Sequence, residues 1–221
     1  LDVLDGTDGV AGLCFVVGDA GIGKTRLARE VADVARARGH RVVWGLGWAD
    51  SGSPPYWPWT QVVRQLVGRA TGTDLASLVL PDDVATDRAE LFDATAAVLQ
   101  DAATAQPLVV VLDDLHLADP PTLALLGFVA THLRDLPLLV LATLRDRDAE
   151  RRPELVEQLA VLDRLATTIP LTGLDVRAVG ELIGSPRRAR DLRAATGGNP
   201  LFLEQAARAD LGATDTLVSV L

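Results

Sequence analysis

Short apolar runs alternate with longer amphipathic stretches along most of this 221-residue chain. Apolar runs without polar interruption are typical of strands that are covered on both faces, and the amphipathic stretches between them are typical of helices that cover those faces. The pattern predicts an α/β fold built on a parallel sheet. The expected strands are Leu13–Val17, Arg41–Leu46, Leu108–Leu112, Leu138–Thr143 and Thr167–Leu171.

Helix signals lie between these strands. Apolar residues at helical spacing predict helices over Thr25–Arg38 and Thr60–Arg69. Three more helix starts follow from a capping box or from a proline that suits a first helical turn. They lie at Asp87 (with Glu90), at Asp119 (with Pro120) and at Pro153.

Beyond Leu171 the strand signals stop, and short helices are expected from Asp175, Pro186 and Pro200. A run of helices after a set of βα units is typical of a lobe added to a sheet domain. We therefore expect two domains, residues 1–171 and a small helical lid over 172–221.

Composition excludes several classes of protein. With 48% hydrophobic residues the chain can bury a substantial core, so disorder is excluded. No apolar run reaches the ~20 residues that cross a bilayer, and no signal peptide opens the chain, so we expect a cytoplasmic protein without membrane contact. A net charge of −9 argues against direct nucleic-acid binding by this segment, because binding to phosphates needs a basic face.

Cysteine and methionine usage adds two expectations. The only cysteine, Cys14, lies inside a predicted strand and is expected to pack in the core, and no cluster of Cys and His has metal-ligand spacing. The chain has no methionine, even at position 1, which suggests a piece of a longer protein.

The first strand is followed directly by GDAGIGKT, which fits the phosphate-loop pattern GxxxxGK[ST] and leads into a helix. Glycines in such a loop let successive amides and the helix N-terminus point at one anion. Lys24 would then bridge the β- and γ-phosphates of a nucleotide, and the Thr25 hydroxyl would bind Mg²⁺. The expected nucleotide-binding residues are Gly18, Asp19, Ala20, Gly21, Ile22, Gly23, Lys24, Thr25 and Arg26.

The alternative interpretation of this segment is a glycine-rich turn with a solvated lysine. Lys24 is the only lysine among 21 basic residues, and all the others are arginine. Arginine can replace a surface lysine but does not fit a loop that needs a narrow point charge. The residue usage therefore favours the phosphate loop.

A second candidate lies where the strand Leu108–Leu112 ends in two carboxylates. We assign Asp113 to the Mg²⁺ site opposite Thr25, and Asp114 to orienting or deprotonating an attacking water. Acidic residues at strand ends also begin ordinary loops, which is the alternative. Strong hydrolases of this class often carry glutamate at the second position, so the shorter Asp114 predicts slow turnover.

Arg145 follows the strand Leu138–Thr143 closely, at the position where a neighbouring strand would deliver a cation to the terminal phosphate. We propose it as a γ-phosphate sensor with a catalytic role beside Lys24 and Asp114. The alternative is a solvated member of the charged run over 145–152.

All four tryptophans and the only tyrosine lie within sixteen positions, interleaved with prolines. Such a cluster can be a partner-docking surface or a hydrophobic plug under a long loop, and the sequence leaves both open. Its members are Trp44, Trp48, Tyr56, Trp57 and Trp59.

The chain carries a phosphate loop, an acidic strand end, Arg145 and a Gly-Asn-Pro turn, in this order. With this combination it resembles the signal-transduction ATPases with numerous domains, and within them the ATPase module of large bacterial LuxR-type and related transcriptional regulators. The likeness is carried by GDAGIGKTRLARE, PYWPWTQVVRQL, VVVLDDLHLADPPTLALL, LVLATLRD and ATGGNPLFLEQ. The chain departs from the family pattern in lacking the Gly-Arg-Glu motif before the first strand and in carrying Leu117 where tryptophan is common. No helix-turn-helix or sensor repeat occurs in it.

The resemblance implies a P-loop NTPase three-layer sandwich with a five-stranded sheet and a central phosphate-loop strand. It also implies a helical lid whose Gly198-Asn199-Pro200 turn approaches the adenine through Pro200. In that family ATP in place of ADP is thought to loosen the lid and to allow self-association.

These observations predict a nucleotide-dependent switch that binds ATP or ADP with Mg²⁺, hydrolyses ATP slowly and regulates other domains of the same chain. Two alternatives stay open. One is a phosphotransferase with the aromatic segment as acceptor pocket, and the other is a module that holds ADP permanently. A GTPase is disfavoured, because the usual guanine-binding motif needs a second lysine.

Overall fold

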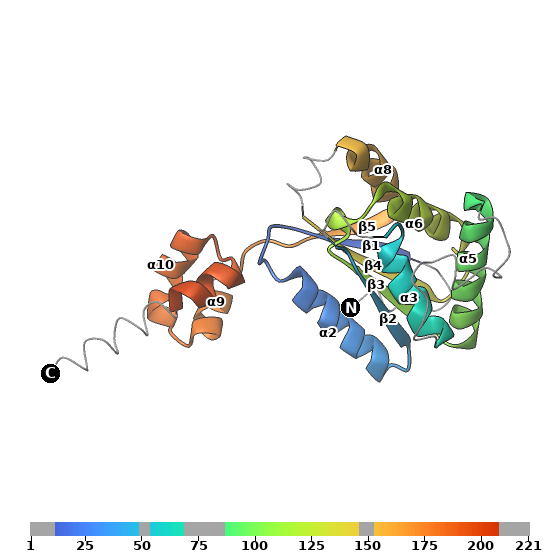
Figure 1. Cartoon of the computed structure of the whole chain (residues 1–221). Helices are drawn as coiled ribbons and strands as arrows, with labels where there is room; N and C mark the ends of the chain where they lie inside the picture. The colour runs from blue at the N-terminus through green and yellow to red at the C-terminus, as the bar shows by residue number, and fades with distance from the viewer. Residues whose placement is uncertain (1–11, 49–53, 69–86, 146–152, 208–221) are drawn as a thin grey trace. The chain divides into compact units, whose positions relative to one another are not determined.

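The computed structural model describes residues 12–48, 54–68, 87–145 and 153–207. Contacts between its residues divide the chain into two compact units. Figure 1 colours the chain by residue number, from blue at the N-terminus to red at the C-terminus. The sheet unit comprises Leu1–Val17 and Thr25–Ile169, and the helical unit comprises Gly18–Lys24 and Pro170–Leu221. The phosphate-loop segment thus groups with the C-terminal residues, while the expected domains 1–171 and 172–221 stay a prediction.

The predicted parallel α/β sheet is confirmed, and no strand end differs from its predicted position by more than one residue. Five strands form one sheet in the order β2-β3-β4-β1-β5. β1 is interior, between β4 and β5, although β4 rather than β1 is the middle strand. The strands are β1 (Gly12–Val17), β2 (Arg41–Leu46), β3 (Leu108–Asp113), β4 (Leu138–Leu144) and β5 (Ala166–Pro170).

The helices of the sheet unit also lie where the pattern predicts them, except that α3 begins at Trp57, three residues before the predicted Thr60. Asp87 accepts a hydrogen bond from the Ala89 amide at 3.4 Å, and Asp119 accepts one from the Thr122 amide at 2.8 Å, so both expected caps form. α2 and α3 lie on opposite sides of β2 (Figure 1). The elements are α2 (Lys24–Ala37), α3 (Trp57–Val67), α5 (Arg88–Ala105), the 3₁₀ turn η1 (Leu115–Leu117), α6 (Pro120–His132) and α8 (Pro153–Asp163).

Both faces of the sheet are buried along its inner strands β1, β3 and β4, whereas the edge strands β2 and β5 are partly exposed, contrary to the expectation that every strand is covered on both faces. Phe15 and Val110 belong to the main hydrophobic cluster, which they share with residues of α3, α5 and α6. Their chain neighbours Cys14 and Val111 are equally buried, and successive strand residues point to opposite faces. The inner strands therefore need cover on both sides, as their apolar runs predict.

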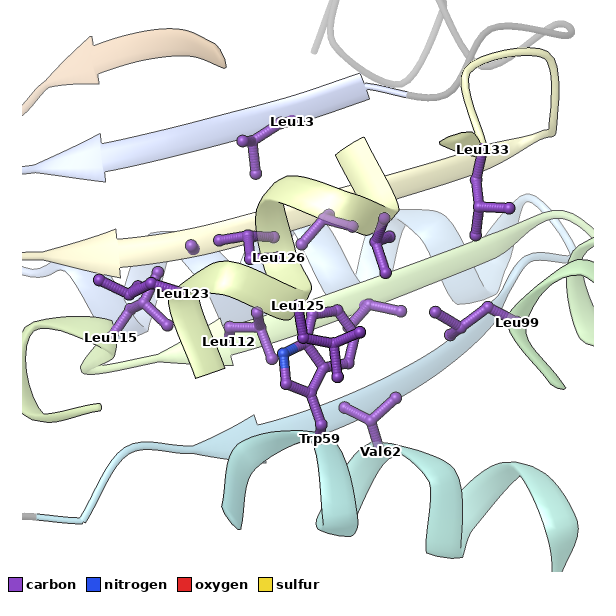
Figure 2. Close-up of a cluster of buried hydrophobic side chains, with 14 of the residues drawn as sticks. Leu13, Trp59, Val62, Leu99, Leu112, Leu115, Leu123, Leu125, Leu126 and Leu133 are labelled. Atoms are coloured by element: carbon purple, nitrogen blue, oxygen red, sulfur yellow. The ribbon is translucent and has the colours of Figure 1, made fainter. Parts of the chain in front are cut away.

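Trp59 fills the centre of the main cluster (Figure 2). Its side chain extends from α3 toward Leu112 and Leu125 and is fully buried. The indole Nε1 donates a hydrogen bond to the Thr122 carbonyl at 3.1 Å, which satisfies its one polar atom inside the core. Trp59 is thus a plug between α3, α6 and the sheet.

The helical unit has its own small core. α9 (Val176–Ile183) begins after Asp175, whose carboxylate accepts from the Ala178 amide at 2.7 Å. α10 (Pro186–Thr196) follows, and a further helix covers residues 200–207. Val179, Ala189 and Leu203, one from each helix, form the buried cluster. In the described part of the chain, no helix has the length and apolar character to cross a membrane.

Candidate functional site

The phosphate-loop segment leaves β1 and turns tightly before α2. Gly21 has a φ of +75° and Gly23 a φ of +108°, both in the left-handed region. Side chains rarely adopt that backbone, so the two glycines permit a turn that other residues would strain. Backbone amides of such a turn converge on one side, which is the arrangement that binds anions.

Lys24 folds back over this loop and does not extend into solvent. Its Nζ donates to the Gly18 carbonyl at 2.9 Å and to the Asp19 carbonyl at 2.8 Å. Only 6% of the residue is exposed. A buried ammonium held by carbonyl oxygens is incompatible with the solvated-lysine interpretation, and it leaves the positive charge at the loop itself.

The sheet unit holds a buried polar cluster at the carboxyl end of β3. The Thr25 hydroxyl donates to the Asp113 carboxylate, at 2.9 Å from Oδ2 and 3.1 Å from Oδ1. The Thr143 hydroxyl donates to Asp113 Oδ1 at 2.6 Å. Only 4% of Asp113 is exposed. The structure therefore brings together Thr25 and Asp113, the two residues that the sequence assigns to Mg²⁺.

Asp114 is held in a different environment from its neighbour. Its backbone is left-handed, with a φ of 53°, and its amide donates to the Thr143 hydroxyl at 2.8 Å. Its side chain is 30% exposed, and the Oδ1 atom lies 3.8 Å from Nδ1 of the buried His116. Gly47 packs so closely here that a Cβ would collide with the Asp114 carbonyl oxygen. The Asp113 carboxylate is thus held by hydrogen bonds, whereas the Asp114 carboxylate is accessible to water.

Arg145 lies one residue beyond the end of β4. In the parallel register Leu144 pairs with Val17, the residue that precedes the phosphate loop in sequence. The structure thus places Arg145 at the same sheet edge as the end of β1, half-buried. The rest of the predicted charged run, over 146–152, lies outside the described residues.

Two further predicted site residues have less distinctive places. Arg26 is exposed on the first turn of α2. Pro200 is the first residue of the helix 200–207, inside the helical unit. Their expected roles, like those of the other site residues, stay predictions.

No group of three or more His, Cys, Asp or Glu side chains suited to a metal occurs among the described residues. Mg²⁺ does not require such a cage, because it keeps several waters and is usually held by one or two protein oxygens together with substrate phosphates. The Thr25 hydroxyl and the buried Asp113 carboxylate are oxygen donors of that kind. The donor set therefore fits Mg²⁺ bound together with a nucleotide.

The aromatic cluster separates into two parts. Trp59 belongs to the core, as described above, whereas Trp48 is 48% exposed. The Trp48 and Trp57 rings lie 5.8 Å apart, and the Arg64 guanidinium lies 5.8 Å from the Trp57 ring centroid. The plug interpretation thus holds for Trp59, and the docking interpretation stays open for Trp48 and Trp57.

Cys14 packs in the core, as predicted. Burial raises the pKa of its thiol to about 11. The buried thiol is therefore protonated near neutral pH, as expected of a cysteine that packs in a core.

Sequence reasoning missed Thr143 and Asn199. Thr143 is a fully buried polar residue in the otherwise apolar run LLVLATL, which could have marked it. Asn199 looked like part of a chain break, but its side-chain Nδ2 donates to the Ala20 carbonyl in the phosphate loop at 2.9 Å. Neither contact is local, since the partners lie 30 and 179 positions away.

Comparison with known proteins gives one family match. A model described as AAA ATPase domain matches residues 1–141. No curated protein matches the sequence.

Solved structures share the fold at low sequence identity. The ORC2 protein of Aeropyrum pernix, solved as ADPNP-ADP complexes, is 17% identical with a TM-score of 0.53 over 94% of this chain. A Signal Transduction ATPase with Numerous Domains from Pyrococcus horikoshii, with a tetratricopeptide repeat sensor, is 19% identical with a TM-score of 0.54 over 91%. AMPPCP-bound DnaA from Aquifex aeolicus is 13% identical with a TM-score of 0.54 over 94%. This chain spans 64%, 28% and 57% of those three chains.

Proposed function

We propose that this chain, which belongs to the AAA ATPase domain family, binds ATP with Mg²⁺, hydrolyses it slowly and serves as a switch in a larger protein. The observation that carries the proposal is the state of Lys24. The only lysine of the chain is buried over the carbonyls of a GxxxxGKT loop. The next residue, Thr25, is hydrogen-bonded to a buried aspartate at a strand end.

In this proposal the loop amides and the Lys24 ammonium stabilise the phosphates. Thr25 and Asp113 would hold Mg²⁺, which when bound offsets negative charge on the phosphate oxygens. Thr143 keeps the Asp113 carboxylate in place by its 2.6 Å hydrogen bond. The partly exposed Asp114 carboxylate orients a water and accepts its proton as the water attacks the γ-phosphorus. The bond to the β–γ bridging oxygen breaks, so that ADP and phosphate leave.

Phosphate release tests the hydrolytic part of this proposal. Asp114→Asn keeps the size of the side chain but removes the base, so we expect γ-phosphate release to fall about tenfold while ATP affinity stays within about twofold. The modest factor reflects the short side chain of Asp114. Asp93→Asn, an exposed carboxylate on α5, is the matched control.

Equal phosphate release from Asp114→Asn and the wild-type chain would remove Asp114 from the mechanism. If the wild-type chain retains ADP through purification and releases no phosphate, the module that holds ADP permanently becomes the better description.

Arg145→Ala tests the proposed γ-phosphate sensor. Only ATP presents a γ-phosphate, so we expect this variant to bind ATP about fivefold more weakly and ADP nearly unchanged. Competition binding with the two nucleotides measures both values in one preparation. An equal loss for ATP and ADP would contradict the sensor role.

The wider setting of the switch follows from the resemblance and from the share of related chains that this one spans. We place it in a multidomain regulator, with a bacterial LuxR-type transcriptional regulator as the preferred kind. In this setting the partners are an adenine nucleotide, other domains of the same chain and a second copy in nucleotide-dependent self-association. We propose a cytoplasmic location and no direct nucleic-acid contact by this segment, in line with its net charge of −9. The phosphotransferase alternative loses support, because Trp59 of its acceptor pocket is buried in the core.

A further inference from the structure

Asn199 uses both ends of its carboxamide inside the helical unit. Its Oδ1 accepts from the Leu201 amide at 3.0 Å, and its Nδ2 donates to the Ala20 carbonyl at 2.9 Å. Only the carboxamide oxygen can accept a hydrogen bond from the Leu201 amide, and only the carboxamide nitrogen can donate one to the Ala20 carbonyl. These two partners therefore fix the orientation of the side chain. Only 7% of the residue is exposed, so water competes little for either hydrogen bond.

The backbone of Asn199 is held equally firmly. Its carbonyl accepts from the Leu203 amide at 3.0 Å, which begins the helix 200–207, and its own amide donates to the Thr196 carbonyl at 3.2 Å. Asn199 is therefore the N-cap of that helix. The Ala20 carbonyl is bound to a residue that cannot move without the helix.

The phosphate loop also packs directly on this helix. A Cβ on Gly21 would lie 2.6 Å from Leu201 Cβ and 3.2 Å from Asn199 Oδ1. At the start of the loop, a Cβ on Gly18 would lie 2.8 Å from the Leu171 carbonyl oxygen. The distances of 2.6 Å to Leu201 Cβ and 2.8 Å to the Leu171 carbonyl oxygen are shorter than real Cβ contacts, so a side chain at Gly21 or Gly18 would force its neighbour to move.

The bond to Ala20 has a consequence for the next amide. The peptide between Ala20 and Gly21 is planar and trans, so its C=O and N–H point in opposite directions. Because Asn199 draws the carbonyl toward the helix 200–207, the Gly21 N–H points away from that helix. The side chain of Asn199 thereby sets the direction of one amide of the loop.

We infer that Asn199 is a positioning residue for the phosphate loop. Its carboxamide joins the loop to the helix 200–207, so that loop and helix move together and the Gly21 amide is oriented for an anion. The inference rests on the proposed function for the identity of the anion, the phosphates of ATP or ADP. It adds a residue-level connection between bound phosphate and the lid, made by the hydrogen bonds of the Asn199 side chain.

Asn199→Asp separates the two roles of the residue. A carboxylate still accepts from the Leu201 amide and suits a helix N-terminus, but it cannot donate to the Ala20 carbonyl and places a second oxygen against it. We expect affinities for ATP and for ADP to fall together by about tenfold, in contrast to the ATP-selective loss at Arg145. Calorimetric titration of the full chain with each nucleotide measures this.

Hydrogen exchange without nucleotide gives a second readout. In Asn199→Asp we expect faster exchange of the amides over 18–24, whereas those over 201–207 stay within about twofold because the cap is retained. Asp175→Ala is the matched control, since it removes the cap of α9 in the same unit without touching the loop. It should speed exchange in α9 alone and leave nucleotide affinity unchanged.

The outcomes separate this inference from the proposed function. Unchanged exchange over 18–24 in Asn199→Asp overturns the inference, as does loosening of the helix 200–207 alone. Faster loop exchange in a chain that binds neither nucleotide supports the connection and overturns the proposed function. Faster loop exchange with the tenfold loss of affinity supports both.

Discussion

Lys24→Ala should lower the affinity of the chain for Mg²⁺·ATP by about a thousandfold. The ammonium is held over the phosphate loop by the Gly18 and Asp19 carbonyls and is almost inaccessible to solvent. Because the ammonium is buried, water screens its attraction to a bound phosphate only weakly. Removing one partner of such a desolvated charge pair costs several kcal/mol of binding free energy. Titration calorimetry at fixed ionic strength measures the change.

Two further variants make this result specific. Lys24→Arg should also bind ATP poorly, because a planar guanidinium does not fit where a compact ammonium sits. Arg29→Ala removes one positive charge from the exposed face of the same helix and should bind like the wild-type chain. If Lys24→Ala and Arg29→Ala weaken binding equally, the effect is general electrostatics and the assigned role of Lys24 is wrong.

Trp59→Ala should destabilise the folded chain by about 3–5 kcal/mol. The side chain is fully buried among α3, α6 and the sheet, and its removal leaves a large cavity and takes away the indole hydrogen bond to the Thr122 carbonyl. Denaturant unfolding followed by far-ultraviolet circular dichroism measures the free energy of unfolding. Trp48→Ala is the matched control, because about half of that side chain is exposed.

We expect the Trp48 variant to lose less than about 1 kcal/mol. Similar losses in the two variants would contradict the assignment of Trp59 as the core plug. The Trp48→Ala variant should fold normally. It can therefore also be tested for altered self-association, which would show whether the aromatic pair Trp48 and Trp57 is a docking surface.

The fold could be predicted because its inner strands β1, β3 and β4 are almost entirely apolar. The predicted ends of strands and helices were wrong where strand pairing or backbone geometry determines them. β3 extends to Asp113, because this polar residue still pairs with Leu46 of β2. α3 begins at Trp57, three residues before the predicted Thr60, because Tyr56 adopts a left-handed backbone and Pro58 fits the first turn. A cluster of prolines looks like a loop in sequence even when it opens a helix.

The candidate site could be predicted only where its chemistry is local. The phosphate loop and Asp113 are read from consecutive residues. Thr143 reaches Asp113 because β3 and β4 are neighbours in the sheet, and Asn199 reaches Ala20 only after the helical unit has folded. The division of Trp48 and Trp59 between surface and core depends likewise on tertiary packing, since the residue type is the same.

Titration of the wild-type chain with ATP in the presence of Mg²⁺ tests the central claim most directly. The account predicts saturable binding of one ATP per chain, with GTP bound more weakly. Absence of detectable ATP binding at millimolar concentration would contradict it.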